Sequence, residues 1–71
     1  MEHVVDLSRA NCQLVQTVGK ARDGETIVVA VEEQHRGMGE MVAGFLRRHL
    51  SSEHKRVSVE VRPYPAVRRW A

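Results

Sequence analysis

The most constraining feature of the sequence is one short stretch that carries no charged side chain and is almost wholly apolar. Thr26–Val31 (TIVVAV) is apolar and β-branched over the length of a single strand. Continuous apolar runs of this length are typical of central strands covered on both faces, whereas half-exposed strands alternate. Such a strand needs other elements packed against it, so we predict a fold that combines helices with a sheet.

Two later segments supply a helix and a second strand. From Met38 to Leu50 the apolar residues recur at the i, i+3, i+4, i+7 spacing of a helix with one buried face. Arg56–Arg62 alternates between apolar and polar residues, which is typical of a half-buried strand. We expect Pro63-Tyr64-Pro65 to end this strand.

The two ends of the chain are read from shorter patterns. His3–Leu7 is rich in β-branched residues and predicts a first strand. Cys12–Arg22 fits a helix with Asn11 as its N-cap, although a strand over Cys12–Val18 fits the β-branched residues there. Ala66–Trp70 is compatible with a terminal edge strand or with the start of a helix.

These elements lead to one architecture. A chain of 71 residues is one domain, residues 1–71, and the order β-α-β-α-β, with a further strand if the end of the chain forms one, favours a two-layer α/β sandwich. We predict two helices on one face of a mixed sheet. The other face of Thr26–Val31 is then left in water, so we expect self-association through that face or through an edge strand.

Charge and composition restrict the classes of partner. Residues 1–35 hold 3 Lys and Arg against 6 Asp and Glu, whereas residues 36–71 hold 8 against 3. A basic second half attracts an acidic protein, an anionic cofactor or RNA, but the net charge of +2 indicates nucleic acid only weakly, as does the pairing of Tyr64 and Trp70 with nearby arginines. No apolar run is long enough for a membrane span and Met1–Val5 does not resemble a secretory signal, so we expect a cytoplasmic chain.

Cys12 is the strongest candidate nucleophile. As the only cysteine it forms no intrachain disulfide, and the four histidines lack metal-ligand spacing, so we expect no metal site. A place in the first turn of a helix favours a thiolate through the helix dipole and the free backbone N–H groups. The alternative is that Cys12 is a small buried core residue.

The residues around Cys12 resemble the TusA (SirA-like) family of small sulfur carriers. In that family an apolar-Asp pair ends the first strand and a Cys-Pro-x-Pro motif opens the first helix, six residues beyond the aspartate. Here Val5-Asp6 and Asn11-Cys12 keep this spacing, and Gly24-Glu25 is also similar to the family's sequences. Gln13 and Val15 stand where the family has its two prolines, and Arg9 stands where it has glycine.

The resemblance implies a βαβαββ fold over nearly the whole chain and a role for Cys12 in carrying sulfur. Cys12 would take a sulfane sulfur from a cysteine desulfurase and pass it to an acceptor, with Asp6, Asn11 and Gln13 as neighbouring binding residues. A divergent relative that kept the fold and lost the carrier role is the alternative. The implied partners are proteins that donate and accept sulfur, and no cofactor is expected.

A second motif follows the Thr26–Val31 strand directly. Gln34, Arg36, Gly37 and Gly39 lie in the sequence Gln-His-Arg-Gly-Met-Gly, which resembles the pyrophosphate-binding signature of the GNAT acetyltransferases. Glycines at a helix start let backbone N–H groups approach an anion, and Arg36 adds a positive charge. This resemblance implies a minimal acetyl-CoA-binding core. A non-enzymatic interaction module that uses the basic second half is the remaining alternative.

Overall fold

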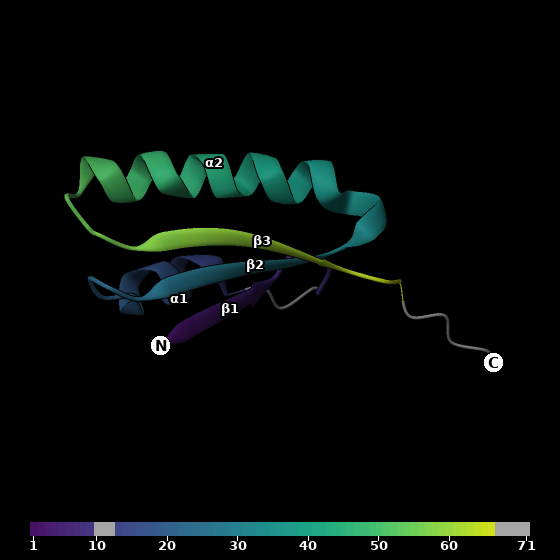
Figure 1. The fold of residues 1–71 in the computed structure, drawn as a ribbon, viewed down its shortest axis with the longest axis horizontal. Helices are drawn as coiled ribbons and strands as arrows, with labels where there is room; N and C mark the ends of the chain where they lie inside the picture. Colours follow the sequence, from purple (N-terminus) through teal and green to yellow (C-terminus); the bar gives the residue numbers. More distant parts are fainter. Residues whose placement is uncertain (10–12, 67–71) are drawn as a thin grey trace.

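The structure is a computed structural model that describes residues 1–9 and 13–66 of the chain. Three strands and two helices alternate along it (Figure 1). They are β1 (Glu2–Asp6), α1 (Leu14–Lys20), β2 (Thr26–Glu32), a single 3-10 turn η1 (Glu33–His35), α2 (Arg36–Ser52) and β3 (Ser58–Tyr64). The two-layer α/β class predicted from the sequence is confirmed.

The sheet has the order β1-β2-β3, with β2 in the centre as predicted. β1 and β3 both run parallel to β2, and the register aligns Val4 with Val28 and Val28 with Glu60. The expectation of a mixed sheet is therefore wrong for the described strands. A helix follows β1 and another follows β2, and each returns the chain to the end of the sheet where it started, so the next strand enters in the same direction.

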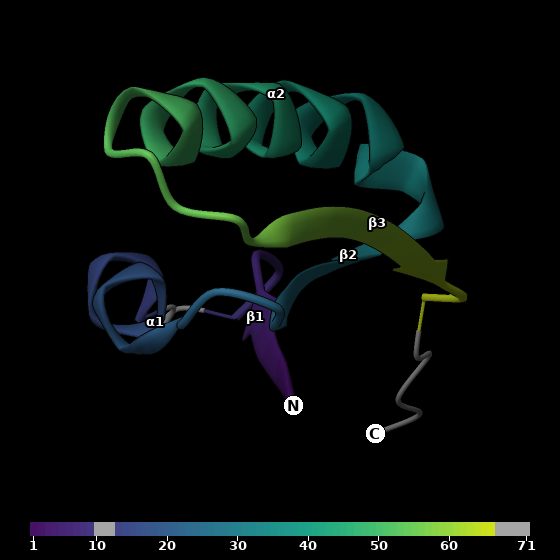
Figure 2. The same cartoon turned by 60° about the vertical axis from the view of Figure 1, so that its left-hand side comes forward.

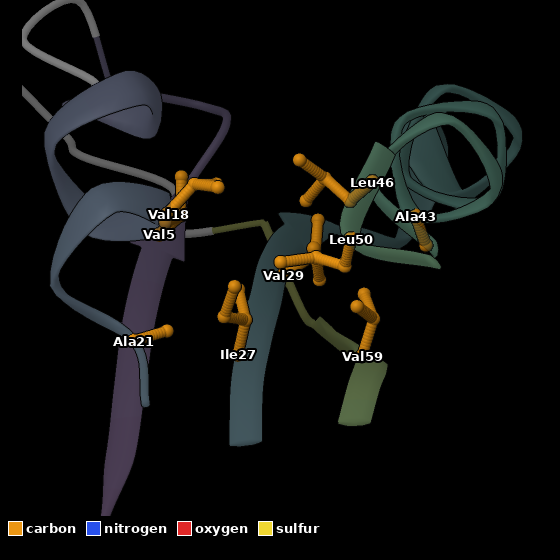
Figure 3. Close-up of a cluster of buried hydrophobic side chains, with 9 residues drawn as sticks. All are labelled: Val5, Val18, Ala21, Ile27, Val29, Ala43, Leu46, Leu50 and Val59. Carbon is orange, nitrogen blue, oxygen red and sulfur yellow. The ribbon is translucent and has the colours of Figure 1, made fainter. Parts of the chain in front are cut away.

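Both helices lie on the same face of the sheet and build one core there (Figures 2 and 3). The buried residues of β2 on this face are Ile27 and Val29, and Leu46 and Leu50 of α2 pack against them. Val18 of α1 reaches into the same cluster from the other side. Residues of one face alternate along a strand, so Val28 and its neighbours point to the opposite side, which we call the open face.

The helices differ in length and in how they begin and end. α2 covers the predicted Met38–Leu50 helix, and its end is closed by backbone bonds from His54 and Lys55 to Ser51 and Leu50, with His54 at a φ of 57°. α1 is a helix, which decides against a strand, but it spans seven residues and begins at Leu14. Gln13 occupies the N-cap position without a side-chain bond, so the prediction of Asn11 as N-cap is corrected.

The turn before β2 also fixes the start of β3. Gly24 adopts a φ of 86°, a conformation that favours glycine, and its N–H donates to the carbonyl of Arg56 at 2.8 Å. The Asp23 carboxylate accepts a bond from the Arg56 N–H at 2.9 Å. These bonds hold Arg56 just outside the sheet, so β3 begins two residues later than predicted.

The far end of β3 runs through a proline. Pro63 is paired in register with Val31 and the strand ends at Tyr64, so β3 stops within the predicted Pro63-Tyr64-Pro65 segment but two residues beyond Arg62. An edge strand tolerates proline because one side of its backbone needs no ladder partner. Of the predicted terminal segment Ala66–Trp70, only Ala66 lies within the described residues.

Polar side chains lie over the central strand on the open face. Val28 is 1% exposed although neither α1 nor α2 covers it. The guanidinium of Arg62 lies 3.3 Å from the Glu2 carboxylate and 2.9 Å from that of Glu60, so its side chain crosses the row of the sheet that contains Val28. Hydrogen bonding to Glu2 and the charge of Glu60 raise the pKa of Arg62. The premise that an apolar face of β2 is left in water is therefore corrected.

Neither helix in the described part of the chain is long and apolar enough to cross a membrane.

Candidate functional site

Polar side chains gather at the edge of the sheet where the parallel strands end. The C-terminal residues of β1, β2 and β3 are Asp6, Glu32 and Tyr64, and the register brings these three strand ends together. In open parallel sheets this edge is where ligands bind, because the loops that follow the strands converge there. We therefore treat this carboxyl edge as the candidate site.

Asp6, at the end of β1, has several polar partners at the carboxyl edge. Its Oδ1 accepts a hydrogen bond from the Ser8 N–H at 3.0 Å and another from the Tyr64 hydroxyl at 2.8 Å. Its Oδ2 lies 3.3 Å from Nε of Arg9, whose side chain is otherwise exposed. Three donors from two segments 58 residues apart thus hold one carboxylate in place.

Ser8 connects Asp6 to the residues that follow β2. The Ser8 hydroxyl oxygen accepts a hydrogen bond from the Glu32 N–H at 3.1 Å. The Glu32 carboxylate in turn accepts one from the side-chain amide of Gln34 at 2.6 Å. Asp6 and Gln34, which the sequence assigned to two different motifs, are therefore connected through Ser8 and Glu32.

Tyr64 closes this network from β3. The Ser8 hydroxyl lowers the pKa of Tyr64, but the hydrogen bond to Asp6, partial burial and the negative charges of Asp6 and Glu32 raise it and prevail. The phenol therefore keeps its proton near neutral pH and donates a hydrogen bond to Asp6. Three contacts hold the Asp6 carboxylate in one orientation, which suits a positioning role.

The network fixes the first part of the connection between β1 and α1. Residues 7–9 are held by Asp6 and by the Leu7 N–H, which donates to the Ala30 carbonyl at 2.9 Å. Asn11 and Cys12 lie outside the described residues. Gln13 is exposed just before α1, and because α1 begins at Leu14 the predicted first helical turn at Cys12 is corrected to start two residues later.

The residues of the second motif do not form one cradle. Gln34 lies in η1 and bonds to Glu32, while Arg36 and Gly37 begin α2 at the surface. Gly39 faces the sheet: a Cβ added there would lie 2.8 Å from Cγ1 of Val31. Gly39 thus allows α2 to pack closely on β2. The carboxylates of Glu32 and Glu33 precede α2, at the helix end where an anion would bind.

Three ion pairs were not predicted from the sequence. His3 Nε2 lies 2.9 Å from Oε1 of Glu25, and Arg62 lies close to both Glu2 and Glu60. The bond from His3 and then the Arg22 N–H lower the pKa of Glu25 below its ordinary value of 4.5. The pairs His3–Glu25 and Arg62–Glu2 join residues far apart in the chain, so they depend on how the strands are arranged, whereas Arg62 and Glu60 lie two residues apart on β3.

A groove of about 400 Å³ separates the two helices. Its walls include Val15 and Val18 of α1 and Phe45 and His49 of α2, and Figure 3 shows Val18 and Leu46 pointing toward one another across the space between the helices. His49 is partly exposed and lies 3.2 Å from the Glu53 carboxylate. The groove is mainly apolar, and its polar lining residues are His49, Glu53 and Lys55.

The described residues include no group of three or more His, Cys, Asp or Glu side chains placed to hold a metal ion. The geometry leaves two features for function: the carboxyl edge around Asp6, and the apolar side chains of the helical layer. Comparison of the chain with protein-family models, with curated proteins and with solved structures finds no match.

Proposed function

We propose that this chain is a small sulfur carrier in which Cys12 holds a persulfide. One observation carries the proposal: Cys12 lies in the connection between β1, which ends at Asp6, and α1, which begins at Leu14. The resemblance to the TusA family implies this order of strand, cysteine and helix. Loops at this edge of a parallel sheet are also the usual ligand-binding loops.

The proposed step needs no oxidant. The thiolate of Cys12 attacks the terminal sulfane sulfur of a persulfide on a donor protein, and the S–S bond of that persulfide breaks. A new S–S bond forms on Cys12, and the donor cysteine leaves as a thiolate. The acceptor protein then removes the sulfur by the same exchange.

In this proposal Asp6 and Arg9 are positioning residues. Asp6 accepts a hydrogen bond from the Ser8 N–H and pairs with the exposed Arg9 guanidinium, so these bonds order the start of the connection that leads to Cys12. Both residues therefore support transfer by fixing the residues that precede Cys12.

The test is the intact mass of the protein after incubation with a cysteine desulfurase and cysteine. We expect a gain of one sulfur, about 32 Da, that dithiothreitol removes. The Cys12→Ser variant should gain nothing, and Asp6→Asn should reach the same mass more slowly. A wild-type protein that stays at its starting mass would reject the proposal.

The acetyl-CoA interpretation has less support from the geometry. Glu32 and Glu33 precede α2, and carboxylates at a helix start compete with a phosphate for the same N–H groups. We therefore expect no binding when CoA is titrated and backbone amide shifts are followed. Saturable shifts confined to residues 34–40 and lost in Gly37→Val would reverse this ranking.

A second candidate function is protein binding by the helical layer. Met41 is 74% exposed and Phe45 is 63% exposed, both on α2. Large apolar side chains that lie side by side in water mark interaction surfaces more often than isolated ones do. The basic charge of the second half supports this candidate less, because Arg47 donates to the Val59 carbonyl and Arg62 is paired on the open face.

A further inference from the structure

We propose that α2 binds α2 of a second copy of this chain in an antiparallel, two-fold pair. The contact surface is the outer face of α2, formed by Gly37, Met41, Gly44, Phe45 and Arg48. This inference specifies the partner in the second candidate function, protein binding, and it is independent of the proposed persulfide chemistry.

The outer face repeats the spacing of the buried face. The residues of α2 that pack on the sheet are Gly39, Ala43, Leu46 and Leu50, at i, i+4, i+7 and i+11. A second set has the same spacing but begins two residues earlier: Gly37, Met41, Gly44 and Arg48. Two residues correspond to a rotation of about 200° around the helix axis, counted from the residues that pack on the sheet. By this rotation the helix carries a second regular stripe on the side opposite to the residues that pack on the sheet.

Nothing in the described chain explains the glycines of this stripe. A Cβ added at Gly37 or Gly44 would meet no atom within 4 Å, and neither residue has a positive φ. Glycine is among the least favourable residues inside a helix, so its presence without an internal contact needs another reason. A second helix that approaches closely supplies one, because small residues let two backbones come together.

The positions of Glu40 and Arg48 along α2 fit a copy of the same helix, turned around. Arg36 and Glu40 lie in the first half of α2, and Arg47, Arg48 and His49 lie in the more basic second half. Within the described residues neither Glu40 nor Arg48 forms an ion pair. An antiparallel partner brings each Arg48 to the Glu40 of the other copy and also opposes the two helix dipoles.

A two-fold axis between Gly44 and Phe45 satisfies all these features together. In this register each Phe45 ring lies over Gly44 of the second copy, and each Met41 lies against the aliphatic stem of Arg48. The Arg48 guanidinium then reaches Glu40 at the rim. Every contact occurs twice, as a two-fold interface requires.

The test is sedimentation equilibrium of the purified full chain between about 10 µM and 1 mM. We expect a monomer–dimer equilibrium for the wild type and at least a roughly tenfold weaker one for Met41→Glu. Met41 is exposed, so the unfolding curve of this variant should match the wild type. The control is Val4→Glu, at another exposed apolar position, on the open face (60%), and it should leave the dimer unchanged.

A charge exchange tests the register. Glu40→Arg and Arg48→Glu should each weaken the dimer about tenfold, because each creates two like-charge contacts, and the double variant should restore the wild-type affinity. Three results would overturn the proposal. The wild-type chain stays monomeric, or Val4→Glu disrupts the dimer and Met41→Glu does not. The third is a double variant that dimerises more weakly than both single variants. Sulfur loading of Cys12 in Met41→Glu reports on the proposed function separately.

Discussion

The two faces of the sheet bury their central side chains by different means. On the helical face, Ile27 and Val29 lie beneath Leu46, Leu50 and Val18, which come from both helices. On the open face, Val28 is equally buried, but the side chain that crosses it is Arg62 with its two carboxylate partners. A parallel sheet normally has helices on both faces, whereas both described helices of this chain lie on one face.

The comparison indicates that one residue with a long apolar stem and a paired charge can cover the central strand of a narrow sheet, as a helix does on the other face. Arg62 achieves this because the sheet has three strands, so a single side chain from β3 reaches β1. The helical face depends on burial of apolar area, whereas the open face depends on ion pairs in contact with water. The two faces should therefore respond differently to truncation, salt and pH.

Truncation on the helical face should have the largest effect. Ile27 is fully buried, and Ile27→Ala removes its contacts and leaves a cavity, so we expect a loss of about 2–5 kcal/mol in the free energy of unfolding. Val29 and Val28 are the matched pair, because they are equally buried on the helical face and on the open face, and Val29→Ala should cost more than Val28→Ala. Urea unfolding measures all three variants, and equal losses for the two valines would mean that the two faces do not differ as described.

The contact between α2 and the sheet gives the next largest effect. In Gly39→Ala the new Cβ would lie 2.8 Å from Cγ1 of Val31 and 3.3 Å from Cγ1 of Val61, so α2 must shift. Overpacking of this kind costs about 1–3 kcal/mol.

Gly37→Ala is the matched control in the same helix. Its Cβ meets nothing within 4 Å, and alanine favours the helix by up to about 1 kcal/mol, so this variant should be neutral or more stable. Thermal unfolding at low protein concentration compares the two variants. A stable Gly39→Ala protein would show that α2 packs less closely on β2 than the structure has it.

Substitution of Arg62 should have a smaller effect that reveals how the open face works. Arg62→Ala uncovers Val28 and leaves Glu2 and Glu60 without their shared partner, so it should lower stability. Arg62→Met keeps an apolar stem over Val28 and should retain part of that stability. Chemical denaturation of the three proteins in low and in high salt separates the contribution of the apolar stem from that of the ion pairs. Salt should weaken the wild type more than Arg62→Met, and equal salt sensitivity would argue against a role for the ion pairs.

The smallest effect is expected from Glu25, whose hydrogen bond to His3 ties the start of β1 to the turn before β2. Because the pKa of Glu25 is lowered in the folded state, its stabilising contribution is present above its ordinary value of 4.5 and is lost as the pH falls through the folded-state pKa. Glu25→Gln should therefore be less stable than the wild type at pH 7. The difference should shrink as the pH falls below that range. A difference that grew with acid would contradict the lowered pKa.

The elements with strong periodicity were predictable from the sequence. The apolar run of β2 and the spacing of the α2 residues each admit one interpretation, because burial of these side chains dominates the free energy of folding. The limits of β3 were not predictable to the residue. They depend on the bonds between Asp23 and Arg56 and on the edge position that tolerates Pro63.

The candidate site was predictable only in part. Asp6 was identified by its distance in sequence from Cys12, which is a local feature. Its partner Tyr64 lies 58 residues away, and the two meet only because both edge strands run parallel to β2 in this register. Periodicity gives the face on which a residue lies, but it does not give the side chain that it meets across a neighbouring strand.

The bonds from Tyr64 to Asp6 and from Arg62 to Glu2 have a further consequence for the order of folding events. Each strand pairs with the next one along the chain, so both pairings close loops of moderate length, whereas these two bonds join residues 58 and 60 positions apart. Closing the longest loops costs the most chain entropy, so we expect these bonds to form after the rate-limiting barrier. Tyr64→Phe should then speed unfolding and leave the folding rate unchanged in stopped-flow measurements. β3, the last of the described strands, would in this way act as a latch that sets how long the native state lasts rather than how fast it is reached.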